Sequence, residues 1–310
     1  MNYFIQASIA VVPLFVLIFS GWLLRKTKVI NENFISKGSL IVFRLALPSL
    51  IIISMSEADF SAAANYKIIP AYLAATAVTY LIVLILSFPA AKPLARAPVI
   101  QGAFRSNTVI VGLALIQSSM GNSAFITGVT LIAVIIPVYN LMASVTLSFP
   151  GGEKGNQVKS TLISILKNPL IWSIAAGAML SAFNIKIPVI LFSSLKYMGQ
   201  LALPLGLLTI GANITVHGVK ERWKGITLAA AGKLIINPLL AVVFADFAGA
   251  SAAGKAVVFI MAASPTAISS FAMTKAMGKD ADAAADIVAI TTALSLFTLT
   301  AGLTFLLRGV

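Results

Sequence analysis

Long apolar runs alternate with short polar segments along the whole chain. Each run is about as long as a bilayer-crossing helix, since about 20 apolar residues span roughly 30 Å of hydrocarbon. We therefore predict ten transmembrane helices, at 3–24, 36–55, 67–88, 99–120, 124–148, 168–183, 195–216, 224–247, 254–276 and 284–307. A sharp turn at 121–123 is expected to separate the fourth helix from the fifth. The longest polar segment, 149–167, lies at the midpoint of the chain.

Two of these runs carry polar or helix-breaking residues at their centres. Run 99–120 contains Ser106, Asn107 and Thr108 in succession, and run 254–276 contains Pro265 between a serine and a threonine. Short polar side chains compete with the helical hydrogen bonds, and proline removes a backbone donor and clashes with the preceding turn. The pattern predicts that both helices are broken near the middle of the membrane. Two interrupted helices at matching places in two halves indicate the binding site of a transporter.

The basic residues are distributed unequally between the two sides of the predicted membrane. Fourteen of the 22 lysines and arginines fall in the odd-numbered loops and five on the opposite side. Arg44, Arg105 and Lys233 lie within spans. Because cytoplasmic loops are enriched in lysine and arginine, the odd loops are predicted to be cytoplasmic and both termini extracytoplasmic. The net charge of +13 is thus a topology signal, and no nucleic-acid partner is expected.

The two halves of the chain share landmarks at nearly one offset. Leu-Ala-Leu-Pro at 45–48 recurs at 201–204, and Pro13 and Pro169 share this offset of 156. The two interruptions are offset by 158. Each half holds five spans, an odd number, so the second half must enter the membrane from the opposite side. We predict an all-α polytopic membrane protein of two inverted five-helix repeats, 1–148 and 168–310, joined by a cytoplasmic loop at 149–167, with broken, crossing helices 4 and 9.

Composition excludes several other classes of protein. The chain is 59% hydrophobic and 10% charged, which no water-soluble domain of this length matches. It has no cysteine and one histidine, His217, so thiolate chemistry and a zinc cluster are not expected. No carboxylate lies deep in a span, which argues against an intramembrane enzyme. The first run begins at Tyr3 without a basic leader and is expected to be a retained span rather than a signal peptide.

The candidate binding residues cluster around the two interruptions. Asn107 is the first choice, because one short side chain supplies both donors and acceptors. Helix halves that begin at a break present free N–H groups and a positive dipole end, which suits an anion. For each serine or threonine, packing between helices or bonding back to its own turn is an equally weighted alternative. The supporting polar positions are Ser106, Thr108, Ser264, Pro265, Thr266, Ser269 and Ser270.

Two charged residues within spans are candidate partners of a substrate charge. Arg44 lies about one third of the way into its span, where its side chain can also snorkel to the interface. Lys233 lies about midway along its span, where it can pair with a substrate carboxylate or with carbonyls near Asn237-Pro238. A receptor with a ligand bound covalently to Lys233 as a Schiff base is a further hypothesis, although ten spans and an inverted repeat argue against it.

Several motifs resemble the auxin efflux carrier family. Arg-Ser-Asn-Thr at 105–108, with Gly112, is similar to a fourth-helix motif that often reads Arg-Gly-Asn-Thr followed by Gly-x-Pro. Lys-Asn-Pro at 167–169 resembles the start of helix six in this family. Positions 47–48, 206–213, 265–276 and 291–295 resemble parts of helices two, seven, nine and ten. The chain departs from the family at Ala114, where proline is usual, and at Ser269, where many members have asparagine.

The resemblance covers nearly the whole chain and implies a bacterial ten-span permease of the bile acid, auxin and arsenite transporter superfamily. It implies a scaffold of helices 1, 2, 6 and 7, often dimeric, and a transport domain of helices 3–5 and 8–10. The expected function is secondary transport of a small organic anion by elevator-type alternating access across the cell inner (plasma) membrane. The implied cargo is auxin-like or a dicarboxylate such as malate or malonate. A sodium-coupled, bile-acid-like symporter is the alternative, and the coupling ion, Na⁺ or H⁺, and a passive channel stay open.

Overall fold

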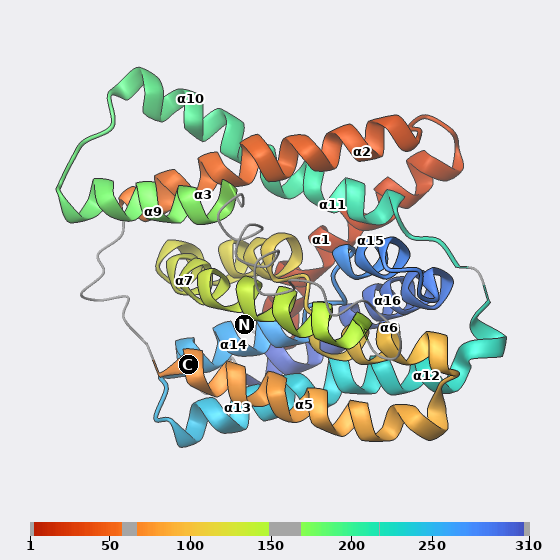
Figure 1. Ribbon diagram of the computed structural model, residues 1–310. Helices are drawn as coiled ribbons and strands as arrows, with labels where there is room; N and C mark the ends of the chain where they lie inside the picture. Colours follow the sequence, from red (N-terminus) through yellow and green to blue (C-terminus); the bar gives the residue numbers. More distant parts are fainter. Residues whose placement is uncertain (1–2, 58–66, 149–168, 217, 307–310) are drawn as a thin grey trace.

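A computed structural model describes residues 3–57, 67–148, 169–216 and 218–306. The described residues are almost entirely helical and include no strand (Figure 1). The predicted loop at 149–167, Asn168 of the helix-six motif and His217 lie outside them. The helices are α1 (Tyr3–Lys26), α2 (Glu32–Ile41), η1 (Val42–Ala46), α3 (Leu47–Ser56), α5 (Ile68–Ala90), α6 (Pro93–Phe104), η2 (Thr108–Gly112), α7 (Leu113–Ser148), α9 (Pro169–Ala182), α10 (Val189–Gln200), α11 (Ala202–Ala212), α12 (Val219–Ala231), η3 (Gly232–Ile236), α13 (Asn237–Phe247), α14 (Ala252–Ala263), α15 (Ser269–Ala276) and α16 (Ala281–Leu306).

Six helical stretches within the described residues are long and apolar enough to cross a membrane. Together with the composition, they identify an all-helical, multi-pass membrane protein. The other predicted spans coincide with shorter helices or with helix pairs that a break divides. The six stretches are Tyr3–Lys26, Glu32–Ser56, Ile68–Ala90, Thr108–Leu147, Val219–Phe247 and Ala281–Leu306.

Two of the helix boundaries that differ from those predicted by hydropathy lie close to prolines. The helix predicted from 99 begins at Pro93, because proline is favourable in the first turn even outside the apolar run. The span predicted at 195–216 was wrong: it covers the end of α10 and all of α11, which meet at Leu201. Pro204 cannot donate a hydrogen bond to the carbonyl four residues earlier, and within the described residues no π-helical turn precedes it to relieve the clash, so the helix is interrupted there. The predicted turn after the fourth helix is confirmed by Gly121, whose φ of 77° interrupts α7.

Two π-helical segments, η1 and η3, precede prolines inside otherwise continuous helices. The Leu47 amide donates to the Val42 carbonyl just before Pro48, and the Asn237 amide donates to Gly232 just before Pro238. A proline clashes with the carbonyl four residues earlier, and a wider turn relieves that clash. The two helices therefore continue through their prolines.

The helices pack as two sets that can be followed in Figure 1. The upper part of the view holds α2, α3, α9, α10 and α11, with α3 against α9 and α10. The lower part holds α5, α6, α12, α13 and α14, with α13 against α5 and α14, and α7 lies between the two parts. Helix α16 packs on α6, α12, α14 and α15, so α15 and α16 belong with the lower set. Helix α1 packs on α11 of the upper set and also contacts α7 and α16. It therefore connects the two sets.

Glycines allow the backbones of α1 and α11 to touch. A Cβ atom at Gly21 would lie 2.0 Å from the Leu208 carbonyl oxygen, and one at Gly211 would lie 1.7 Å from the Ile18 oxygen. Small residues that allow such close approach are typical of helix pairs in membranes. The pairing of α1 with α11 is thus fixed by two residues that cannot carry a side chain.

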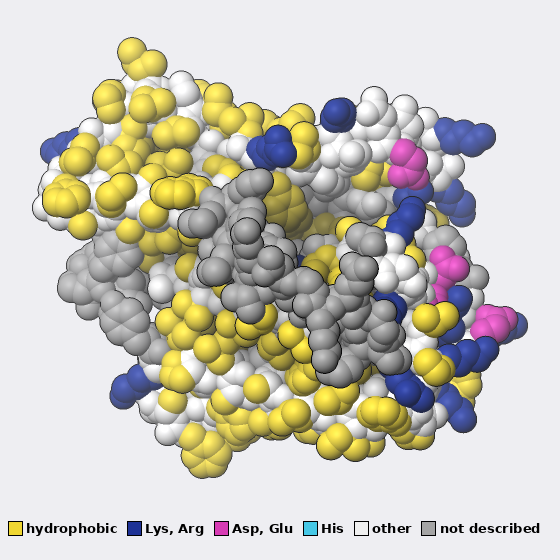
Figure 2. All heavy atoms as spheres, viewed as in Figure 1, with side chains coloured by type: hydrophobic (Ala, Val, Ile, Leu, Met, Phe, Trp, Pro, Cys, Tyr) yellow, Lys and Arg dark blue, Asp and Glu magenta, His cyan; other side chains and the backbone are white. Residues whose placement is uncertain are grey.

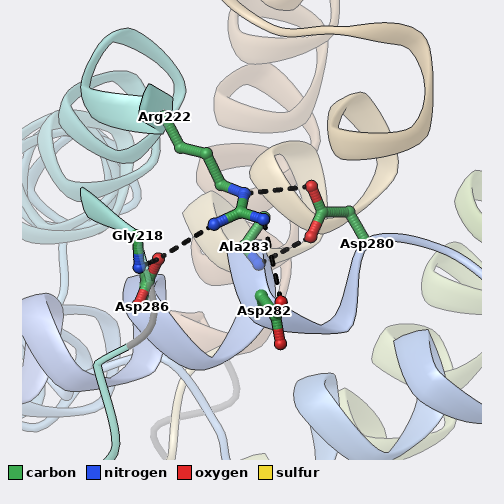
Figure 3. A network of polar contacts seen from close by, with 6 residues as sticks. All are labelled: Gly218, Arg222, Asp280, Asp282, Ala283 and Asp286. Carbon is green, nitrogen blue, oxygen red and sulfur yellow. Dashed lines mark hydrogen bonds and ion pairs between the residues drawn. The ribbon is translucent and has the colours of Figure 1, made fainter. Parts of the chain in front are cut away.

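Charged side chains gather at one end of the helices, at the right of Figure 2. Arg222, in the first turn of α12, pairs with three aspartates at the start of α16, at 3.1 Å from Asp280, 3.8 Å from Asp282 and 3.7 Å from Asp286 (Figure 3). The Asp286 side chain is fully buried and also accepts a hydrogen bond from the Gly218 amide, at 3.1 Å. This network, which we call the Arg222 cluster, fixes the start of α12 to the start of α16.

Candidate functional site

Two helices are interrupted side by side in the interior. Helix α6 ends at Phe104 and η2 begins at Thr108, while α14 ends at Ala263 and α15 begins at Ser269. The short segments between these helices run antiparallel and form a bridge at Ser106 and Thr266. The Asn107 amide donates to the Pro265 carbonyl at 2.7 Å, and the Ala267 amide donates to the Arg105 carbonyl at 3.0 Å. We call these two hydrogen bonds the main-chain bridge.

The bridge explains how backbone groups outside a helix are accommodated in an apolar interior, where each unsatisfied group costs several kcal/mol. Nearby side chains satisfy further groups. The Thr266 amide donates to the Thr291 hydroxyl at 3.1 Å, and the Thr266 hydroxyl donates to the Gly102 carbonyl at 2.7 Å. The Ser264 hydroxyl bonds back to the Ile260 carbonyl at 2.7 Å. Thr266 therefore joins the break to α6 and α16, whereas Ser264 bonds within its own helix.

A cavity of about 480 Å³ lies on one side of the bridge. Its walls come from both breaks, from α7 and α15, and from the set of helices that includes α2, η1, α9 and α11. The cavity thus lies between the two sets of helices. Its polar lining residues are Ser39, Arg105, Ser106, Asn107, Thr108, Tyr139, Asn140, Thr209 and Ser269.

The predicted site residues divide into two groups by their position. Asn107, Ser106, Thr108 and Ser269 line the cavity. The other predicted residues at the breaks, Ser264, Pro265, Thr266 and Ser270, are buried outside its lining. Ser270 is 2% exposed, and its hydroxyl has no hydrogen-bond partner among the described residues.

Neither of the predicted charge partners lines the cavity. Arg44 lies in η1 with an exposed side chain, as the snorkelling interpretation expects. Lys233 lies in η3, is fully buried, and donates a hydrogen bond to the Ser106 hydroxyl. Ser106 is also 3.4 Å from the hydroxyls of Tyr72 and Tyr139, which are 2.8 Å apart. Lys233 therefore approaches the break through Ser106 and is not part of the cavity wall.

The cation that lines the cavity is Arg105, which sequence reasoning treated as part of a motif and not as a ligand. Its side chain is only 7% exposed. One terminal nitrogen donates to the Asn140 side-chain oxygen at 2.8 Å, and the other contacts the Met273 sulfur at 3.1 Å. None of the ion pairs formed by the described residues includes Arg105. The signal was available in the sequence, since Arg105 is a charge near the centre of an apolar run.

The described residues include no group of three His, Asp or Glu side chains that could hold a metal ion. The arrangement at the cavity is instead suited to binding an anion. A guanidinium offers paired donors to a carboxylate, and a thioether is only a weak competing acceptor. The N-terminus of α15, at Ser269, faces the same cavity and favours negative charge.

The sequence of the chain is similar to those of known membrane transport proteins. A family model described as "Membrane transport protein" matches residues 6–302. The chain is 24% identical over 307 residues to a "Putative malonate transporter" of Rhizobium meliloti, covering 96% of this chain and 95% of the relative. It is 21% identical over 304 residues to an "Uncharacterized transporter" of Methanothermobacter thermautotrophicus, covering 96% and 97% of the two chains.

These relatives are named as transporters, and the match extends over nearly the whole chain. The resemblance seen in the sequence motifs is therefore confirmed at the level of the family. The protein is a transporter, not an enzyme, and belongs to the membrane transport protein family of auxin efflux carriers.

Proposed function

We propose that this protein is a secondary transporter of a small organic anion, a dicarboxylate such as malonate or malate, with the cavity as its substrate site. The observation that carries the proposal is Arg105, a buried guanidinium that lines a cavity and takes part in none of the ion pairs of the described residues. A charge in an apolar interior is costly unless it is paired. An anionic substrate would supply the missing partner.

The remaining walls suit a small dicarboxylate. One carboxylate would take the guanidinium N–H groups of Arg105, since charge-assisted pairs of this kind are strong and directional. The second would lie near Asn107 and Ser106 or near the N-terminus of α15. The volume of about 480 Å³ is within the usual range of small-molecule sites, about 300–1,000 Å³. The name of the Rhizobium meliloti relative supports malonate as the first compound to test.

The position of the cavity supports alternating access. It lies between the set that contains α2, α9 and α11, which we assign as the scaffold, and the set that carries the two breaks, which we assign as the transport domain. The scaffold residues on its wall are close to helix ends: Leu170 is the second residue of α9, and Ile210 is two residues before the end of α11. Both ends are cytoplasmic in the topology predicted from the basic residues. The cavity would then open to the cytoplasm, as in an inward-facing transporter.

This assignment includes the ten-span, inverted-repeat architecture, elevator-type movement of the transport domain, and a homodimer in the inner (plasma) membrane with both termini outside. The sodium-coupled alternative predicts that accumulation of the anion stops when sodium is replaced by choline. A receptor with a ligand on Lys233 is not favoured, because that amine is fully buried and outside the cavity lining.

Counterflow in proteoliposomes tests the function directly. Vesicles loaded with unlabelled malonate, malate, acetate or lysine would be diluted into labelled malonate, with protein-free vesicles as the control. We expect saturable accumulation of label in vesicles loaded with either dicarboxylate and none in vesicles loaded with lysine. Flux that does not saturate would indicate a channel. No flux of any carboxylate would refute the proposal.

A further inference from the structure

The fully buried Lys233 has no role in the substrate site described above. It lies in η3, which packs against α5, α6, α12, α13, α14 and α16. Its amine donates to the Ser106 hydroxyl, and Ser106 is one of the residues that line the cavity. A single side chain therefore separates the amine of Lys233 from the space in which an anion would bind.

The hydrogen-bond partner that the structure gives to Lys233 is a hydroxyl, not a carboxylate. The carboxylates on the helices packed around it lie toward helix ends, where Asp282 and Asp286 pair with Arg222, and Asp246 pairs with Lys255 at 2.8 Å. The titratable and charged groups on the elements packed against η3, with the neighbouring Arg105 and Tyr139, are Tyr72, Tyr80, Arg96, Arg105, Tyr139, Lys220, Glu221, Arg222, Lys224, Asp246, Lys255, Asp282 and Asp286.

An ammonium group in this position needs negative charge nearby, because a buried ion without a counter-ion is costly. An anion bound at Arg105 and Asn107 would lie next to Ser106 and would supply that charge. By linkage, a proton on Lys233 would favour the bound anion to the same extent as the anion favours the proton. When the anion leaves, the ammonium group of Lys233 loses the negative charge that stabilises it, and release of the proton is favoured.

We propose that Lys233 is the proton-binding site of this transporter and couples the movement of each anion to that of one proton in the same direction. The inference rests on the proposed function. On one side of the membrane the Nζ lone pair takes a proton from water as the anion binds, and on the other side the N–H bond breaks and the proton returns to water as the anion leaves. The amine provides the positive charge that a bound sodium ion would otherwise bring. Transport is therefore independent of sodium.

Two assays on the same proteoliposomes separate the inference from the function on which it rests. Counterflow of malonate needs no net proton movement, whereas uptake against a gradient does. With the membrane potential clamped at zero by potassium and valinomycin, an inward gradient of one pH unit should drive about tenfold accumulation in the wild type, since one pH unit corresponds to a factor of ten. Replacing sodium by choline should change nothing.

By the linkage above, the Lys233→Met variant should show a raised KM for malonate, yet it should keep counterflow at saturating malonate and lose the accumulation. The control is Lys196→Met, which removes an exposed lysine of α10 and should behave as the wild type. Tenfold accumulation by Lys233→Met, or sodium-dependent accumulation by the wild type, would overturn the inference. A wild type without counterflow would instead overturn the proposed function, and with it the inference.

A measurement on the wild type alone covers the case in which Lys233→Met does not fold. Purified protein in weakly buffered solution at pH 8, where malonate is fully ionised, is mixed with malonate, and a pH indicator reports the exchange of protons. We expect proton uptake that saturates with malonate binding and approaches one proton per protein. Binding without proton uptake would overturn the inference while leaving the transport function intact.

Discussion

Removing the guanidinium of Arg105 is the most direct perturbation of the proposed site. In the structure one terminal nitrogen donates to Asn140 at 2.8 Å, and the other rests 3.1 Å from the Met273 sulfur. Because sulfur is a weak acceptor, the second nitrogen is the one that a carboxylate can recruit. A hydrogen bond to a charged group contributes about 1.5–3 kcal/mol. Arg105→Met should therefore raise the malonate KM by about 10- to 150-fold.

The conservative Arg105→Lys variant should lie between Arg105→Met and the wild type. It keeps the charge but loses the planar pair of donors, so part of the carboxylate contact remains. The matched control is Arg44→Met, which removes an arginine from another span whose side chain is exposed and outside the cavity lining. That control should leave KM within twofold of the wild type, because no contact with the substrate is lost.

Thermal unfolding without substrate distinguishes a binding role from a structural one. Arg105→Met removes a buried charge that belongs to none of the ion pairs of the described residues, which offsets the loss of the hydrogen bond to Asn140, so the melting temperature of the empty protein should change little. The stabilisation by added malonate should disappear in this variant, since a ligand stabilises by mass action. An unchanged KM, or the same malonate-induced shift as in the wild type, would refute the assignment of Arg105 to the substrate.

Three further substitutions test other parts of the structure. Asn107→Ala should raise the malonate KM about tenfold, because it removes one polar contact at the cavity wall. Gly211→Ala should destabilise the protein by about 1–3 kcal/mol or more, measured by thermal unfolding, because its new Cβ would meet the Ile18 carbonyl oxygen at 1.7 Å. Arg222→Met should lower the stability by about 1–3 kcal/mol through the loss of a partner to the buried Asp286, while KM stays the same.

Each of these substitutions has an outcome that contradicts its reasoning. Ser264→Ala serves as the control for Asn107, because Ser264 lies at a break but outside the cavity lining, and an equal rise in KM for both variants would count against a contact with the substrate. Gly38→Ala is the control for Gly211, since its nearest contact would be a Thr209 side-chain methyl group at 3.1 Å and not a backbone carbonyl. Equal melting temperatures for those two variants would show that the packing argument is wrong. A changed KM in Arg222→Met would show that its ion pairs affect the substrate site.

The positions of the helix breaks could be predicted from the sequence because their cause is local. Pro265 cannot continue a helix, and three short polar residues at 106–108 weaken one. The direction in which each side chain points could not be predicted. Thr266 and Ser264 have the same chemistry as Thr108 and Ser106, yet the first two bond to nearby carbonyls and the last two line the cavity. That difference depends on how helices far apart in the sequence pack.

The positions of the charged side chains could not be predicted from the sequence either. Hydropathy marks Arg44, Arg105 and Lys233 alike as charges in apolar runs, and it contains no information about helix rotation. In the folded chain one is exposed, one lines the cavity and one is fully buried behind Ser106. Two of these helices also widen into a π-helical turn at the charged residue, η1 at Arg44 and η3 at Lys233. A π-helical turn changes the direction of every side chain that follows it.

The main-chain bridge has a consequence for how such a carrier can evolve. Its two hydrogen bonds join backbone amides to backbone carbonyls, so almost any replacement of a side chain leaves them in place. Only proline at position 107 or 267 would delete a donor. Substitutions at Ser106 or Asn107 can therefore alter which substrate binds while both hydrogen bonds of the bridge remain. New substrate specificities can therefore arise by single substitutions while the main-chain bridge is retained.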